Sequence, residues 1–133
     1  MNAFIKFNRG VLKMPLHWQL WLVLLVTANG VSPLFFLQHV EAQAVLVGFL
    51  VSMTLMTLLT ARFGFTRIVG LGHIVWVPLL AFLLTRFGDI PASAALGIWL
   101  RTLFVLNGIS LVLDAADAIR YIAGERQETV AGL

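Results

Sequence analysis

The chain has 133 residues, of which 60% are hydrophobic and only 11% are charged, and its mean hydropathy is +0.96. Soluble domains carry about 25% charged residues, so the composition excludes an ordinary soluble domain and indicates a protein surrounded by lipid. The sequence has no cysteine, which excludes disulfides and thiolate chemistry, and its small net charge of +3 does not indicate a nucleic-acid partner.

Residues 1–15 predict a short helix that lies in the membrane interface, because they are too polar to cross the bilayer. In a helical projection the apolar and basic side chains take opposite sides: Phe4, Ile5, Phe7, Val11 and Leu12 against Lys6, Arg9 and Lys13. Pro15 favours a break before the next element. A disordered basic segment is the alternative interpretation.

Four apolar segments follow, at about residues 16–37, 42–61, 68–85 and 92–113 or slightly beyond. Each has close to the roughly 20 residues that a helix needs to cross about 30 Å of hydrocarbon. The short linkers between them favour antiparallel neighbours. We therefore predict an all-α integral membrane protein in one domain, residues 1–133. It is an antiparallel bundle of four transmembrane helices with an interfacial N-terminal helix and a cytoplasmic tail at 123–133.

The distribution of Lys and Arg predicts how the bundle is oriented. Seven basic residues fall at one face of the predicted bundle: Lys6, Arg9, Lys13, Arg62, Arg67, Arg120 and Arg126. The opposite face has only Arg86. Because cytoplasmic loops carry an excess of Lys and Arg, we expect the N-terminus and the C-terminus to be cytoplasmic.

The fourth span carries an unusual polar stripe. Asn107, Ser110, Asp114, Asp117 and Tyr121 are separated by 3, 4, 3 and 4 residues, which places them on one helical face. Polar groups inside a span need partners, since lipid cannot hydrogen-bond them.

Depth in the membrane predicts one of those partners. At about 1.5 Å of rise per residue, Asp114 is about 9 Å inside Arg120, and His73 is about 9 Å inside Arg67. The short linker between the third and fourth spans makes them neighbours, so His73 and Asp114 are expected to meet. Gly70 and Gly72, beside His73, permit close approach of another helix.

The sequence therefore predicts a polar intramembrane site made of His73, Asp114, Asp117, Asn107 and Ser110. Such a cluster can hold a proton, a cation or a ligand. The alternative interpretation is structural: His73 holds helices together, and the aspartates reach headgroups and water at the helix end.

Arg101 is a second anomaly, because it lies two to three turns inside the outer end of the fourth span. A buried arginine needs acceptors or a carboxylate. Asn29 and Ser32 of the first span have a similar depth and are its expected partners, with Glu41 or Asp89 from the outer loops as further choices. Snorkelling of Arg101 to the outer headgroups is the alternative.

The positions of the histidines do not indicate a metal or haem site. No two histidines share a helical face, so no metal site is expected. Among the three histidines only His73 lies well inside a span, and haem would require two copies of the chain, each contributing His73. We expect no cofactor in a single chain.

Two strings, LTARFGFTRIVGLGHIVWVPL (Leu59–Leu79) and LNGISLVLDAADAIRYIAGER (Leu106–Arg126), resemble those of small four-span proteins of bacterial inner membranes. The resemblance covers most of the chain. It implies a four-span topology and a bacterial inner (cytoplasmic) membrane, and it implies no activity or catalytic residues.

These observations predict a non-enzymatic multi-pass inner-membrane protein, an accessory or oligomer-forming unit. The first alternative is a transporter or channel subunit that uses His73, Asp114 and Asp117, and the second is a haem-binding dimer through His73. The expected partners are the lipid bilayer and either a second copy or another membrane protein, without nucleic acid.

Overall fold

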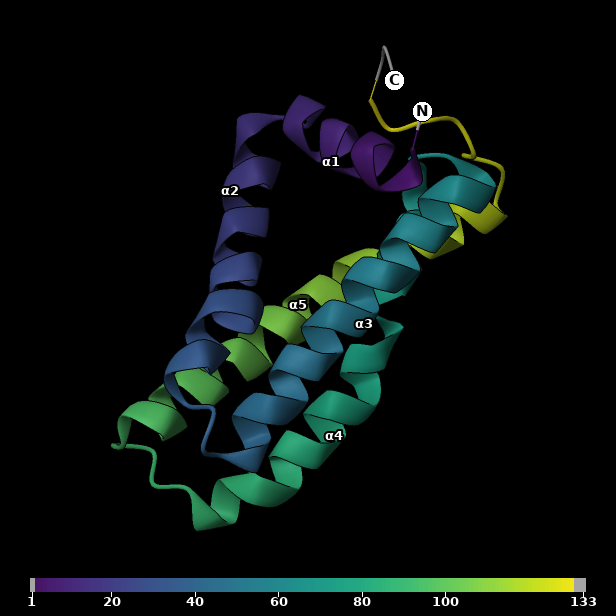
Figure 1. The fold of residues 1–133 in the computed structure, drawn as a ribbon. Helices are drawn as coiled ribbons and strands as arrows, with labels where there is room; N and C mark the ends of the chain where they lie inside the picture. The colour runs from purple at the N-terminus through teal and green to yellow at the C-terminus, as the bar shows by residue number, and fades with distance from the viewer. Residues whose placement is uncertain (1, 131–133) are drawn as a thin grey trace.

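The computed structural model describes residues 2–130, and within that range every regular element is helical (Figure 1). Residues 2–130 form five α-helices: α1 (Ala3–Lys13), α2 (Leu16–Val26), α3 (Val40–Phe63), α4 (Trp76–Arg86) and α5 (Ala95–Ile122). A π-helix, η1 (Thr27–Val31), and three 3₁₀ segments, η2 (Ser32–Phe35), η3 (Arg67–Val75) and η4 (Phe87–Asp89), extend them. The all-α prediction is confirmed, while residues 131–133 of the predicted tail lie outside the described range.

Joined end to end, these elements form four segments that are long and apolar enough to cross a membrane: Leu16–Phe35, Val40–Phe63, Arg67–Asp89 and Ala95–Ile122. Only 22% to 39% of the most apolar stretch of each segment is buried inside the structure. Large apolar side chains such as Val47, Val105 and Val112 are exposed on the outer faces of the helices. An outer surface of this kind suits contact with lipid tails.

The first segment changes helix type where proline forbids a regular α-helix. Pro33 has no N–H, and its ring would clash with the carbonyl of Asn29 four residues earlier. The backbone responds by widening into η1, in which the N–H of Ser32 donates to the Thr27 carbonyl, and then tightens into η2.

The third segment also changes type, and its glycines set how it packs. Pro78 lies in the first turn of α4, where no N–H is required. The preceding turns form η3, in which Gly72 packs on α3 so closely that an added Cβ would lie 2.9 Å from the backbone nitrogen of Met56. The close approach expected at Gly72 is therefore present.

The helices are not packed evenly. In Figure 1, α3, α4 and α5 lie together, α2 leans away from α3 and α5 toward the end where the chain begins, and α1 crosses that end. Phe7 of α1 packs edge-on against Phe65, with ring centroids 5.9 Å apart. The tail joins the same end, because Glu128 pairs with Lys6 at 2.6 Å.

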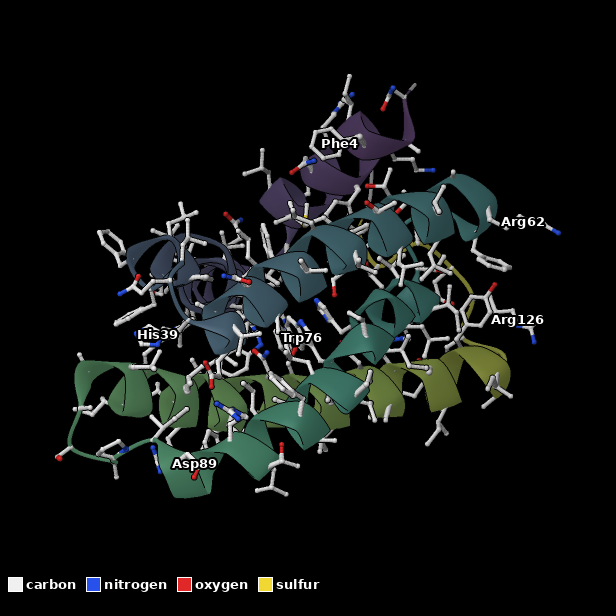
Figure 2. The ribbon with its side chains drawn as sticks, turned by 60° about the horizontal axis from the view of Figure 1, so that its bottom comes forward. Phe4, His39, Arg62, Trp76, Asp89 and Arg126 are labelled. Atoms are coloured by element: carbon white, nitrogen blue, oxygen red, sulfur yellow. The ribbon has the colours of Figure 1, made fainter. Side chains whose placement is uncertain are left out.

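Labelled polar and charged side chains lie at the two ends of the bundle. Figure 2 shows Arg62 and Arg126 at one end and His39 and Asp89 at the other, with Trp76 in the interior between them. The ion pair between Lys6 and Glu128 belongs to the end with Arg62, because both side chains lie next to Gly64.

The main apolar core fills the half of the bundle near the α4–α5 connection, and it includes Leu25, Val45, Trp76, Leu79, Leu83, Leu100 and Leu103. Within this half, two asparagines connect the first and fourth segments. Asn29 Nδ2 donates to Asn107 Oδ1 at 2.8 Å, and Asn107 Nδ2 donates to Asn29 Oδ1 at 2.9 Å. Both side chains are fully buried, and Asn29 also donates to the Leu25 carbonyl.

We predict that Asn29→Leu lowers the free energy of unfolding by roughly 1–3 kcal/mol, because the buried amide of Asn107 loses its partner. The double variant Asn29→Leu/Asn107→Leu is expected to be less destabilised than the sum of the two single variants, since no unpaired amide remains. Unfolding in detergent, followed by circular dichroism, measures both values. Strictly additive losses would contradict the pairing.

Candidate functional site

The structure brings His73 and Asp114 together, as their matched depth predicted. His73 Nδ1 lies 2.7 Å from Asp114 Oδ2, and the two side chains are only 10% and 17% exposed. A hydrogen bond at this distance places one proton between the imidazole and the carboxyl group. The pair joins η3 to α5 inside the apolar part of the bundle.

Two neighbours fix the orientation of this pair. The imidazole of His73 is stacked on the indole of Trp76, with ring centroids 4.1 Å apart and an interplanar angle of 12°. Asp114 lies directly over Gly70, where an added Cβ would be 2.6 Å from Oδ1. The absence of a side chain at Gly70 therefore allows the carboxylate to reach His73.

Asp117 lies one turn further along α5 and belongs to a charged rim. Arg67 Nη1 donates to Asp117 Oδ1 at 2.7 Å, and Arg67 Nε lies 3.2 Å from Glu125. Arg120 also pairs with Glu125, at 2.8 Å. These four residues are half-buried or exposed, so the rim stands between the buried pair and the surroundings of the bundle.

A cavity of about 640 Å³ lies beside the pair and is lined by residues of α1, α2, α3, η3 and α5. One wall is polar and comes from η3 and α5; it includes His73, Ser110, Asp114 and Asp117. The other walls come from α1, α2, α3 and the α1–α2 connection, and apart from Asn8 and Ser52 they are apolar. They include Val11, Met14, Trp18, Trp21, Phe49 and Met53. Thr129 and Val130 of the tail line its rim-side end.

Three buried polar atoms in the cavity wall have no hydrogen-bond partner within residues 2–130: Ser52 Oγ, Thr66 Oγ1 and Trp76 Nε1. Buried polar groups in proteins are nearly always paired, so three exceptions around one cavity are unusual. They add hydrogen-bonding capacity to a wall that already holds Asp114.

The predicted five-residue cluster is divided in the structure. Ser110, Asp114 and Asp117 line the cavity together with His73. Asn107, on the same face of α5, is committed to Asn29 in the core. The polar stripe of α5 therefore has two roles. Asn107 makes a contact between helices, and the residues from Ser110 to Asp117 form part of the cavity wall.

The expected partners of Arg101 were wrong. Its guanidinium donates to the carbonyls of Gly97, Phe87 and Ile90, at 3.2, 3.0 and 2.9 Å, and it lies over the Phe87 ring. Backbone carbonyls at the α4–α5 connection satisfy Arg101 because that connection folds back over the start of α5. Asn29 bonds to Asn107 instead, and Ser32 is half-buried in η2.

An ion pair at the same end was not predicted. Arg86 Nε donates to Glu41 Oε1 at 2.8 Å, and the Glu41 side chain is buried. The sequence contained a signal for it, because Glu41 directly precedes the second predicted span and Arg86 directly follows the third, so both belong to one end of the bundle. Glu41 was instead considered for Arg101.

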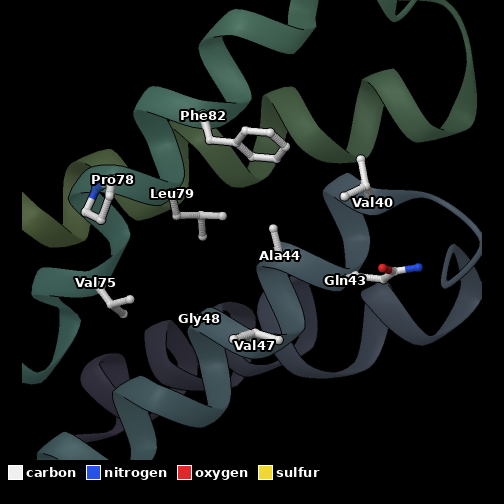
Figure 3. Close-up of a pocket in the computed structure, with 9 residues that line it drawn as sticks. All are labelled: Val40, Gln43, Ala44, Val47, Gly48, Val75, Pro78, Leu79 and Phe82. Atoms are coloured by element: carbon white, nitrogen blue, oxygen red, sulfur yellow. The ribbon is translucent and has the colours of Figure 1, made fainter.

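A second hollow differs in chemistry. Figure 3 shows a groove of about 420 Å³ between α3 and α4, lined by Gly48, Pro78, Leu79 and other apolar residues, with Gln43 as its one polar side chain. An added Cβ at Gly48 would lie 3.4 Å from the Leu79 side chain, so α3 and α4 are in ordinary van der Waals contact here. This groove holds no ionisable group and is suited only to apolar contact.

The geometry also bears on metal and haem. Within residues 2–130, no group of three or more His, Asp or Glu side chains is arranged to hold a metal ion. His73 is buried, stacked on Trp76 and bonded to Asp114. Because Nδ1 of His73 is engaged by Asp114, a haem iron could be ligated only through Nε2.

Comparisons of the chain with protein-family models, with curated proteins and with solved structures found no match. The resemblance to small four-span inner-membrane proteins therefore stays a prediction.

We predict that Gly70→Ala lowers the free energy of unfolding by roughly 1–3 kcal/mol, because the new methyl group displaces the Asp114 carboxylate. Gly108→Ala is the matched control on α5, where an added Cβ meets nothing within 4 Å. There, alanine is expected to stabilise the helix by up to about 1 kcal/mol. Unfolding in the same detergent compares the variants, and equal stability for both would contradict the close contact at Gly70.

Proposed function

We propose that the protein is a multi-pass protein of a bacterial inner membrane, with four antiparallel spans and both termini in the cytoplasm. The excess of Lys and Arg at the end that includes Arg62, Arg67 and Arg120 supports this orientation. In this proposal α1 lies in the cytoplasmic interface, with Lys6 bonded to the tail and Phe4 and Ile5 exposed to lipid.

In this membrane, the proposed role is that of a non-enzymatic accessory protein that binds a small molecule. The observation that carries the proposal is the cavity of about 640 Å³ with the His73–Asp114 pair in its wall. Ligand pockets typically have about 300–1,000 Å³, mostly apolar walls and a few convergent polar groups, and this cavity has all three properties.

Binding is favoured over catalysis because the ionisable groups are committed to one another. Asp114 pairs with His73, and Asp117 pairs with Arg67. Transport through one chain is less well supported, since the cavity ends at Leu25 and Trp76, which belong to the main core. For an oligomer or a partner membrane protein, the apolar groove between α3 and α4 offers the contact surface.

The cysteine-free sequence allows a direct test. Ser110→Cys places a thiol on the cavity wall, about 15 Å inside Arg120. Thr54→Cys is the matched control, because Thr54 is exposed on α3 outside the cavity and lies about 12 Å inside Arg62. In inside-out vesicles, a membrane-impermeant maleimide is expected to label Ser110→Cys at least about tenfold faster than Thr54→Cys, since thiolates form in water and not in lipid.

In right-side-out vesicles neither cysteine should react. Equal, slow labelling of both variants in inside-out vesicles would contradict an accessible cavity. Faster labelling of Ser110→Cys from the opposite side would overturn the orientation but not the cavity.

A further inference from the structure

We infer that the cavity binds an amphipathic organic cation, a molecule with an apolar or aromatic body and one positive charge. The inference rests on the proposed binding function and specifies the chemistry of its ligand. It follows from which charges of the cavity wall are already paired, and which atoms of the wall remain available.

The positive groups of the wall are already neutralised. Arg67 is shared between Asp117 and Glu125, and Arg120 is bonded to Glu125 through two of its nitrogens. An anionic ligand would therefore have to displace a carboxylate from an arginine before it gained a partner. The residues that line the cavity include two arginines and two aspartates, so the wall carries no net formal charge when His73 is neutral. Glu125, which does not line the cavity, pairs with both arginines.

Besides the unpartnered polar atoms of Ser52, Thr66 and Trp76, the charged atom of the wall that remains available is a carboxylate oxygen. Asp114 Oδ2 contacts His73, whereas Oδ1 lies over the Cα of Gly70, and no N–H or O–H of residues 2–130 donates to it. An incompletely paired carboxylate in apolar surroundings attracts a cation far more strongly than it would in water, because the effective dielectric constant is low. The same field repels an anion of equal size.

The opposite walls suit the body of such a molecule. Trp18 and Trp21 of α2 and Phe49 of α3 present aromatic rings to the cavity, and aromatic faces attract organic cations. Met14 and Met53 are flexible and polarizable, so the wall can adapt to bodies of different shape. A cation placed between Asp114 and these rings meets favourable groups on both sides.

The position of the cavity suggests how the ligand enters. Trp18 is 37% exposed, and α2 leans away from α3 at this end of the bundle. The wall formed by α1 and α2 is thin, since it is one helix deep and faces the surroundings directly. An amphiphile that partitions into the cytoplasmic leaflet can therefore reach the cavity sideways between these helices.

The test compares two ions of nearly the same shape and opposite charge, tetraphenylphosphonium and tetraphenylborate. Equilibrium binding of each is measured with the full chain in nanodiscs, and empty nanodiscs give the contribution of lipid. We expect the phosphonium ion to bind at least about tenfold tighter than the borate. Asp114→Asn should weaken phosphonium binding roughly tenfold or more, as expected for loss of a charged partner.

Two further variants serve as controls. Asp89→Asn removes a carboxylate from η4, at the other end of the bundle, and should leave binding unchanged. Leu22→Trp enlarges a half-buried side chain of the cavity wall and should weaken binding of any occupant. If Asp114→Asn fails to fold, Asp117→Asn is measured instead. This variant removes a carboxylate that neutralises Arg67, so the positive charge of Arg67 should weaken phosphonium binding.

The outcomes separate this inference from the function on which it rests. Equal or tighter binding of the borate, lost in Leu22→Trp, would overturn the cationic ligand while leaving the binding function intact. If the affinity for phosphonium is unchanged in both Asp114→Asn and Asp117→Asn, the proposed role of the carboxylates is wrong. If neither ion binds above empty nanodiscs and Leu22→Trp has no effect, both the ligand class and the binding function are wrong.

Discussion

A polar side chain inside an apolar bundle must find a partner, and this constraint determines how α5 is placed. Its inward face carries three polar groups at successive levels. Asn107 is bonded to Asn29 of the first segment, whereas Asp114 is bonded to His73 of the third. Asp117 is bonded to Arg67. Because the partners come from different segments, α5 can satisfy all three only in one rotation and at one height.

The same pairings explain why a cavity forms. At the level of Asn107 the first segment packs closely on α5, since the two amides require direct contact. At the level of Asp114 the partner is His73, so nothing holds α2 against α5, and α2 leans away. The tail and α1 then cover the space, held by Lys6 and Glu128. The cavity is therefore a consequence of which segment supplies each partner.

Much of this arrangement is predictable from the sequence, but the position of each polar side chain around and along its helix relative to the neighbouring helices is not. Span lengths identify the four apolar segments, and counting residues from the basic ends correctly brings His73 to Asp114. The same counting wrongly assigned Asn29 to Arg101, because the depth counted along the first segment does not correspond to the depth counted along α5. Asn107 is six residues, or about 9 Å, further along α5. Arg101 bonds to carbonyls of an irregular connection, and the cavity depends on a helix tilt, so neither has a signal in residue spacing.

The central claim is that His73 and Asp114 are energetically coupled inside the bundle. A double-mutant cycle with His73→Ala, Asp114→Ala and the double variant tests it most directly, by unfolding each protein in the same detergent. Residues in direct contact show interaction energies of about 0.5–3 kcal/mol, and we predict at least about 1 kcal/mol for this pair. Losses that add within about 0.3 kcal/mol, as for distant and independent sites, would contradict the account.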